Sequence, residues 1–264
     1  MMVAPLVDAH AHVFTKDMPL IGAPRHRPNY DFTTEQFLAT LDEHGVGFGV
    51  IAAASIYGDY NDYTIEAVRT SKRLRGTVIL EPTVERYVLE QMKRDGIVGV
   101  RLPYLELDPL PDLTSFEQRR LLRRLADLDW HVHLHIEGER APPLIDLLEA
   151  SGVKLVIDHM GRPDARTGIN SAGFKAVLRS IERGRTWVKL SAGYRMGPAA
   201  MEYGRELVKH AGPERLVWAS DCPFVGHEAK VRYRQTIDWF VECVPDPVAR
   251  AKIGGETPMK LYFS

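Results

Sequence analysis

The chain of 264 residues alternates eight times between a short apolar run and a longer amphipathic run, and this alternation limits its fold most strongly. Short β-branched runs are typical of strands buried on both faces, whereas apolar residues three or four apart are typical of helices that pack on a sheet. Strands are expected at residues 6–13, 46–55, 76–82, 97–102, 131–136, 154–159, 187–191 and 216–220. Helices are expected at residues 34–44, 61–73, 84–94, 115–128, 141–150, 171–183, 198–211 and 228–242.

Eight strand-then-helix units in a chain of this length predict an α/β fold, a (β/α)8 TIM barrel, with residues 1–264 in one domain. An open doubly wound sheet often carries a glycine-rich phosphate turn after its first strand, but here that strand is followed by Thr15-Lys16-Asp17. The first connection, residues 14–33, is long for a compact barrel, and long connections of this kind are often functional lids.

Composition narrows the class of protein. The formal net charge is −1, and basic and acidic residues are interspersed, so neither a nucleic-acid partner nor a membrane surface is indicated. The longest apolar stretches are too short to span a bilayer, and the chain does not open with a secretory signal pattern. Two cysteines, Cys222 and Cys243, suit a reducing compartment. We therefore expect a cytoplasmic enzyme.

Polar residues stand where the expected strands end, and TIM-barrel chemistry takes place at the carboxyl ends of the strands. His10 and His12 of the first strand point to the same face because they are two residues apart. His131 and His133 lie deeper in the fifth strand and are expected in the core. Other strands end in Arg101, His135, His159 and Asp221. Each residue alone is a weak signal, but together they predict one shared site.

The residue types in this cluster indicate its chemistry. Imidazoles and a carboxylate are good ligands for one zinc or manganese ion, which would lower the pKa of a bound water. Asp221 is a candidate for binding the ion and for taking a proton from that water. His159 is a candidate for stabilising an oxyanion or for assisting proton transfer. Without a metal, the same cluster still provides a base and oxyanion donors.

Motifs over almost the whole chain carry a family resemblance, beginning with Asp8-Ala9-His10-Ala11-His12 and continuing to Ala219-Ser220-Asp221-Cys222-Pro223. Between and after them lie the similar segments 55–58, 99–102, 133–138, 157–163, 188–195 and 253–262. Together they resemble the amidohydrolase superfamily, in particular the lactonases of its amidohydrolase-2 branch. The resemblance implies a distorted TIM barrel that hydrolyses a lactone or a related ester-like bond. It places the first-strand histidine pair, His135 and Asp221 at the metal or substrate position, with Asp221 as general base beside His159.

One departure from the superfamily pattern bears on the number of metal ions. The binuclear members carry a carboxylated lysine or a glutamate at the fourth strand, where this chain has Arg101. We therefore expect at most one ion. The lactonase branch also includes members that need no metal, so metal-assisted and metal-independent hydrolysis both remain open.

Arginines indicate a negatively charged substrate, because a guanidinium holds a carboxylate through two parallel hydrogen bonds. The candidate substrate-binding residues are Arg101, Arg162, Arg195, Tyr57 and Ser55. An alternative is that some of these arginines pair with nearby acids, such as Asp158 or Glu137, and fix loops.

The sequence thus predicts a hydrolase that opens a carboxylate-bearing lactone from aromatic or sugar-acid catabolism, by attack of water on the ring carbonyl. A metal-dependent non-oxidative decarboxylase or a lactone isomerase on the same barrel is the nearest alternative. A catalytically silent carboxylate-binding barrel is the alternative from another class. A homo-oligomer is compatible with the composition, whereas nucleic-acid and membrane partners are not expected.

Overall fold

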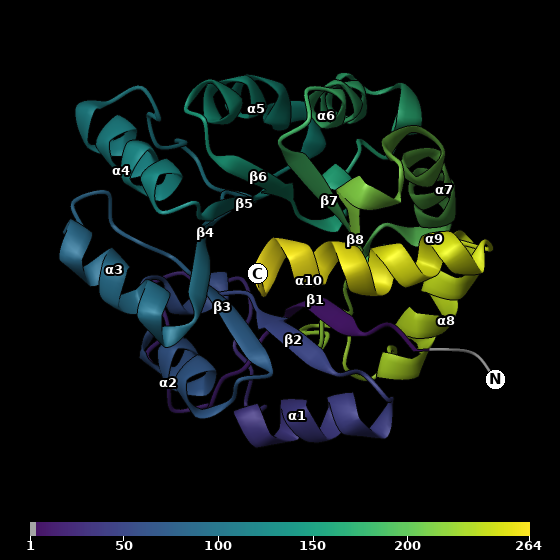
Figure 1. The fold of residues 1–264 in the computed structure, drawn as a ribbon, viewed down its shortest axis with the longest axis horizontal. Helices are drawn as coiled ribbons and strands as arrows, with labels where there is room; N and C mark the ends of the chain where they lie inside the picture. Colours follow the sequence, from purple (N-terminus) through teal and green to yellow (C-terminus); the bar gives the residue numbers. More distant parts are fainter. Residues whose placement is uncertain (1–3) are drawn as a thin grey trace.

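A computed structural model describes residues 4–264, which form one eight-stranded parallel sheet closed into a barrel (Figure 1). The strands follow chain order: β1 (Val7–Ala11), β2 (Phe48–Ile51), β3 (Leu74–Val78), β4 (Ile97–Pro103), β5 (His131–His135), β6 (Lys154–Ile157), β7 (Thr186–Leu190) and β8 (Leu216–Trp218). Hydrogen bonds close the circle just beyond β1 and β8, where His12 N donates to Cys222 O at 2.8 Å and Asp221 N donates to His10 O at 2.9 Å. The predicted TIM barrel is confirmed.

Helices cover the outside of the barrel (Figure 1). They are α1 (Thr34–Glu43), α2 (Asp62–Thr70), α3 (Arg86–Asp95), α4 (Phe116–Asp127), α5 (Ala141–Ala150), α6 (Ala172–Glu182), α7 (Ala200–Ala211) and α8 (Tyr233–Cys243), followed by α9 (Pro247–Ala251), a π-helical turn (Lys252–Glu256) and α10 (Thr257–Tyr262). All eight expected helices are present. The eighth begins at Tyr233 rather than at residue 228, because the Gln235 side chain accepts the Arg232 N–H at 2.7 Å and caps the helix there. None of the described helices is long and apolar enough to span a membrane.

The third strand was expected at residues 76–82 and lies instead at Leu74–Val78. Its apolar run does continue past Val78, but the Asn61 side chain intercepts the backbone there. The Asn61 amide accepts the Ile79 N–H at 3.1 Å and donates to the Ile79 carbonyl at 2.8 Å. Both backbone groups of Ile79 are thereby satisfied outside the sheet, which ends the strand.

The amino end of the barrel is packed with apolar side chains, which leaves the carboxyl end for polar chemistry. Figure 1 shows α10 crossing this end, and its Leu261 and Tyr262 pack there against Val7, Val50 and Val217. His131 and His133 are buried in this region, as expected from the sequence. The functional groups described below therefore rest on a closed, rigid base.

Candidate active site

The predicted site residues lie at the carboxyl end of the barrel, and most of them line one cavity. The cavity is lined by His12, Ser55, Arg101, His135, His159, Arg162, Arg195 and Asp221. His10 lies behind these residues and is fully buried. Tyr57 does not line the cavity, since its ring packs against Phe14 in a separate apolar cluster.

Asp221 is surrounded by imidazoles. It lies beyond β8 in a turn with a φ of 66°, and its Oδ1 is 3.6 Å from Nε2 of both His10 and His12. His159 follows β6 in a similar turn, with a φ of 52°, and its Nε2 is 3.7 Å from the same oxygen. These left-handed turns aim the side chains of both residues at one point, at a cost in backbone strain.

The second carboxylate oxygen of Asp221, Oδ2, accepts hydrogen bonds from two residues of the loop after β7. The Tyr194 hydroxyl donates to Oδ2 at 2.6 Å, and Nε of Arg195 donates to it at 2.8 Å. Burial alone would raise the pKa of Asp221, but the charged guanidinium of Arg195 outweighs it and holds this pKa well below its usual range. Asp221 is therefore an ionised carboxylate with Oδ1 left to accept a proton.

His135 and His159 are both neutral. Burial lowers the pKa of His159 to about 3, and its Nδ1 is 2.8 Å from Ser191 Oγ. Burial, followed by the charge of Arg101, holds the pKa of His135 well below its usual range. Nη2 of Arg101 lies 3.2 Å from Nδ1 of His135, and because arginine only donates, this Nδ1 must accept. The His135 proton is thus on Nε2, which has no hydrogen-bond partner within the described part of the chain.

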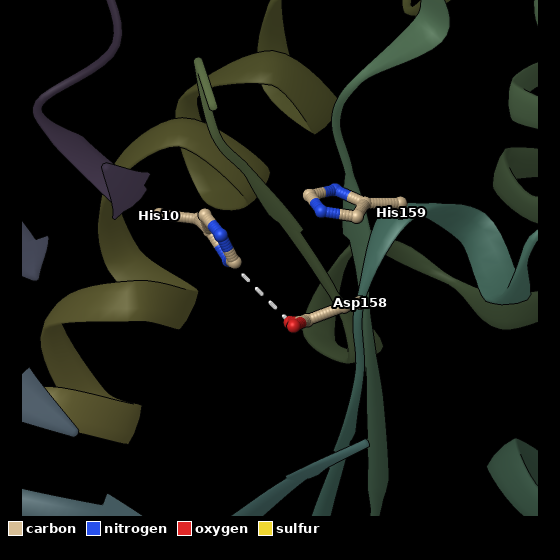
Figure 2. Close-up of side chains that lie close together, drawn as sticks. All are labelled: His10, Asp158 and His159. Carbon is tan, nitrogen blue, oxygen red and sulfur yellow. Dashed lines mark ion pairs between the residues drawn. The ribbon is translucent and has the colours of Figure 1, made fainter. Parts of the chain in front are cut away.

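Asp158 is a site residue that the sequence indicated only as a possible arginine partner. Its Oδ2 accepts from Nε of Arg101 at 3.0 Å, and its Oδ1 is 3.0 Å from Nζ of Lys189. Figure 2 shows Asp158 facing His10, whose Nδ1 is 3.5 Å from Oδ1, with His159 nearby. Burial raises the pKa of Asp158, but the charges of Lys189 and Arg101 outweigh it and hold this pKa well below its usual range.

Lys189 of β7 was missed as a site residue. It is fully buried in the barrel, and its Nζ lies 2.9 Å from Nδ1 of both His10 and His133. A signal for it exists in the sequence, because a lysine inside the apolar run Val188-Lys189-Leu190 must be buried with a partner.

The arginines of the cavity differ in how far they are already paired. Arg101 is buried against Asp158 and also donates to the Ala53 carbonyl at 2.9 Å, as the alternative interpretation of the sequence anticipated. Arg195 is held by Asp221. By contrast, the guanidinium of Arg162 has no hydrogen bond or ion pair to any group within residues 4–264, and burial lowers its pKa. Of these three arginines, Arg162 is the one whose donors are all free.

Two loops roof the cavity, which has a volume of about 70 Å³. Arg25 and His26 come from the long first connection, and Val225 comes from the loop after β8. The Tyr30 hydroxyl donates to Glu228 at 2.8 Å and ties the two loops together. A ring-shaped substrate needs more room than this, which favours movement of these loops when a substrate enters. A larger cavity of about 390 Å³ lies behind the β7 loop, but it is lined by neither acids nor histidines.

Comparison with known proteins agrees with this arrangement. The family model described as amidohydrolase matches residues 7–263. The chain belongs to the amidohydrolase family. It is 28% identical to 2-pyrone-4,6-dicarboxylate hydrolase of Comamonas testosteroni, over 98% of this chain and 90% of the relative. It is 27% identical to 4-sulfomuconolactone hydrolase of Rhizobium radiobacter, over 97% and 89%. A solved structure from Acinetobacter baumannii, a probable 2-pyrone-4,6-dicarboxylic acid hydrolase with citric acid bound, has a TM-score of 0.93 and 30% identity, and covers 98% of this chain and 100% of that one.

Amidohydrolases are typically metal-dependent, and the spacing of ligand atoms in this member suits an ion. Two groups bring such atoms within 4.8 Å of one another, namely His10 with His12 and Asp221, and His10 with Asp158 and His159. His12 is also suitably oriented. Its Nδ1 is 2.7 Å from the Ala52 carbonyl, to which it must donate, and this leaves a lone pair on Nε2.

The hydrogen bonds of two other expected ligands do not fit a metal ion. Nδ1 of His135 accepts from Arg101, and Nδ1 of His10 lies 2.9 Å from the lysine amine of β7. An imidazole that accepts at Nδ1 carries its proton on Nε2, the atom that a metal in the cavity would need. The spacing of this amidohydrolase site therefore suits an ion, whereas its proton arrangement opposes one.

Proposed function

We propose that the protein is a cytoplasmic hydrolase that opens a lactone ring bearing carboxylate groups. The observation that supports this most directly is the free guanidinium of Arg162 beside the ionised carboxylate of Asp221. A free cation binds an anionic substituent, and the carboxylate is placed to act on water. The relatives named above are hydrolases of lactones, and one similar structure holds citric acid, a tricarboxylic acid.

In the proposed reaction, water donates a hydrogen bond to Oδ1 of Asp221 and attacks the ring carbonyl carbon. Asp221 takes the proton, and the developing oxyanion accepts a hydrogen bond from Nε2–H of His135, whose lack of a partner leaves it free for this role. The bond between the carbonyl carbon and the ring oxygen then breaks. His159, 3.7 Å from Asp221, passes the proton to the departing oxygen, which leaves a hydroxy acid or its keto tautomer.

Binding and orientation come from the arginines and Ser55. Arg162 holds one carboxylate of the substrate, and Arg195 bridges a second anionic group and Asp221. Ser55 lies at the rim, where Arg25 Nη2 is 3.4 Å from its hydroxyl. Arg101 acts mainly by fixing Asp158 and His135. The steps above use no metal ion, in agreement with the proton positions at His10 and His135.

The test is a product assay on a panel of lactones that includes 2-pyrone-4,6-dicarboxylate and 4-sulfomuconolactone. We expect an open-chain product that has gained one water, and we expect Asp221→Asn to slow its formation by about 10²-fold or more. A product of unchanged mass indicates a lactone isomerase, and release of carbon dioxide indicates a decarboxylase. Lack of turnover of any lactone, or full activity of a folded Asp221→Asn variant, overturns the proposal.

A further inference from the structure

We infer that Lys189 is a positioning residue that fixes the proton of His10 on Nε2. His10 is thereby made a hydrogen-bond donor toward the cavity, and it loses the lone pair that a metal ion would need. The ammonium group of Lys189 then supplies the positive charge in this part of the site. These hydrogen positions do not depend on which lactone binds, so they are testable in the protein without substrate.

The first support is the number of donors and acceptors around Lys189. An ammonium group has three N–H bonds and no lone pair. Nζ of the fully buried Lys189 has three neighbours at hydrogen-bond distance: Nδ1 of His10 at 2.9 Å, Nδ1 of His133 at 2.9 Å and Oδ1 of Asp158 at 3.0 Å. The two imidazole nitrogens are its hydrogen-bond partners, and the carboxylate oxygen is its ion-pair partner. Both imidazoles must accept at Nδ1, so each carries its proton on Nε2.

The charges of the cluster agree with this assignment. Burial lowers the pKa of Lys189, and the carboxylate of Asp158 opposes that effect. Burial, together with the charge of Lys189, keeps the pKa values of His10 and His133 well below their usual range, so both imidazoles are neutral. An ionised Asp158 without a charged lysine would be a buried carboxylate with only Arg101 as partner, which is costly.

The second support is independent of Lys189. Nδ1 of His12 donates to the Ala52 carbonyl, so Nε2 of His12 presents a lone pair. This atom lies 3.3 Å from Nε2 of His10. A hydrogen on Nε2 of His10 makes that contact a donor–acceptor pair, whereas two facing lone pairs would repel each other unless a cation lay between them.

The competing arrangement has the His10 proton on Nδ1, donated to Asp158. That contact is 3.5 Å long, compared with 2.9 Å to Lys189. It would also direct the Nδ1–H bond of His10 toward the hydrogens of the ammonium group. Only removal of the lysine amine makes this second arrangement favourable. Lys189 therefore decides whether His10 presents a hydrogen or a lone pair to His12.

The first experiment needs no substitution. Histidine labelled with nitrogen-15 distinguishes the two tautomers by NMR in metal-free protein, and a His10→Gln variant assigns the signals of His10. We expect the Nε2–H tautomer in the unaltered protein. Observation of the Nδ1–H tautomer overturns the inference, whether or not the protein hydrolyses lactones.

The second experiment replaces the ammonium by an uncharged group of similar length. In Lys189→Met we expect His10 to change to the Nδ1–H tautomer and the affinity for zinc, titrated alone by calorimetry, to rise at least tenfold. Lys154→Met is the matched control, because Lys154 is also a strand lysine paired with an aspartate, Asp129, but lies at the amino end of the barrel. Equal zinc affinity in a folded Lys189→Met variant and in the unaltered protein overturns the inference.

Discussion

Replacing Arg162 by methionine separates substrate binding from folding, because this guanidinium makes no hydrogen bond or ion pair within the described residues. A bond between charged groups contributes about 1.5–3 kcal/mol. At about 1.4 kcal/mol for each factor of ten, its loss lowers kcat/KM for a carboxylate-bearing lactone by roughly 10- to 150-fold. Folding stability is expected to be unchanged or higher, since burial of an unpaired cation among other arginines is unfavourable.

Steady-state kinetics on a charged and an uncharged lactone, together with urea unfolding, measure both effects. The matched control is Arg195→Met, which removes a donor from Asp221 at 2.8 Å and is expected to lower kcat as well as stability. For Arg162→Met, kcat/KM within twofold of the unaltered enzyme on the charged lactone contradicts the reasoning. An equal loss on both lactones contradicts it too, since the arginine would then not be recognising charge.

Four further predictions concern the general base Asp221, the pH dependence of its ionisation, the contact between the two loops over the cavity, and the need for a metal ion. Asp221→Asn lowers kcat by about 10²-fold or more without a comparable change in substrate Kd, measured by calorimetry. The pKa of Asp221 in the folded protein lies below its usual value of 3.8. Its ionisation therefore stabilises the fold above pH 3.8, and this stabilisation is lost as the pH falls through the pKa of the folded protein. Profiles of kcat/KM and unfolding against pH should therefore show no acid limb from Asp221 above 3.8. Tyr30→Phe removes the bond to Glu228, worth about 1 kcal/mol, and should speed proteolysis of the loop at residues 14–33. Dialysis against a chelator should leave activity unchanged, and its loss with recovery on adding zinc would contradict the proton assignment.

The sequence was sufficient to predict the barrel, because eight periodic units admit few other folds, and to bring His10, His135, His159 and Asp221 to one end of it. Strand ends were less predictable. The end of β3 depends on Asn61, a side chain remote in sequence that takes over the backbone groups of Ile79. The hydropathy pattern of the sequence does not predict such a contact.

Roles within the site were harder to predict than its location. Tyr57 follows β2 and suggested a substrate contact, but its ring turns away to pack against Phe14. Tyr194 was not singled out, although its hydroxyl donates to Asp221 at 2.6 Å. Its position after β7 gave no indication of this, because the direction of a loop side chain is set by its tertiary packing. Lys189 was visible as a charge in an apolar strand, but its partners come from β1, β5 and the turn after β6.

A pair of histidines two residues apart on a strand does not by itself determine whether a site binds a metal ion. His12 has a backbone carbonyl behind its ring, and a carbonyl accepts, so the ring presents a lone pair. His10 has an ammonium group behind its ring, and an ammonium donates, so the ring presents a hydrogen. With a carbonyl behind both rings, two lone pairs would face one cation. With a carbonyl behind one and Lys189 behind the other, the two rings satisfy each other. The residues behind the pair, rather than the pair, therefore decide between a metal-dependent and a metal-independent amidohydrolase site.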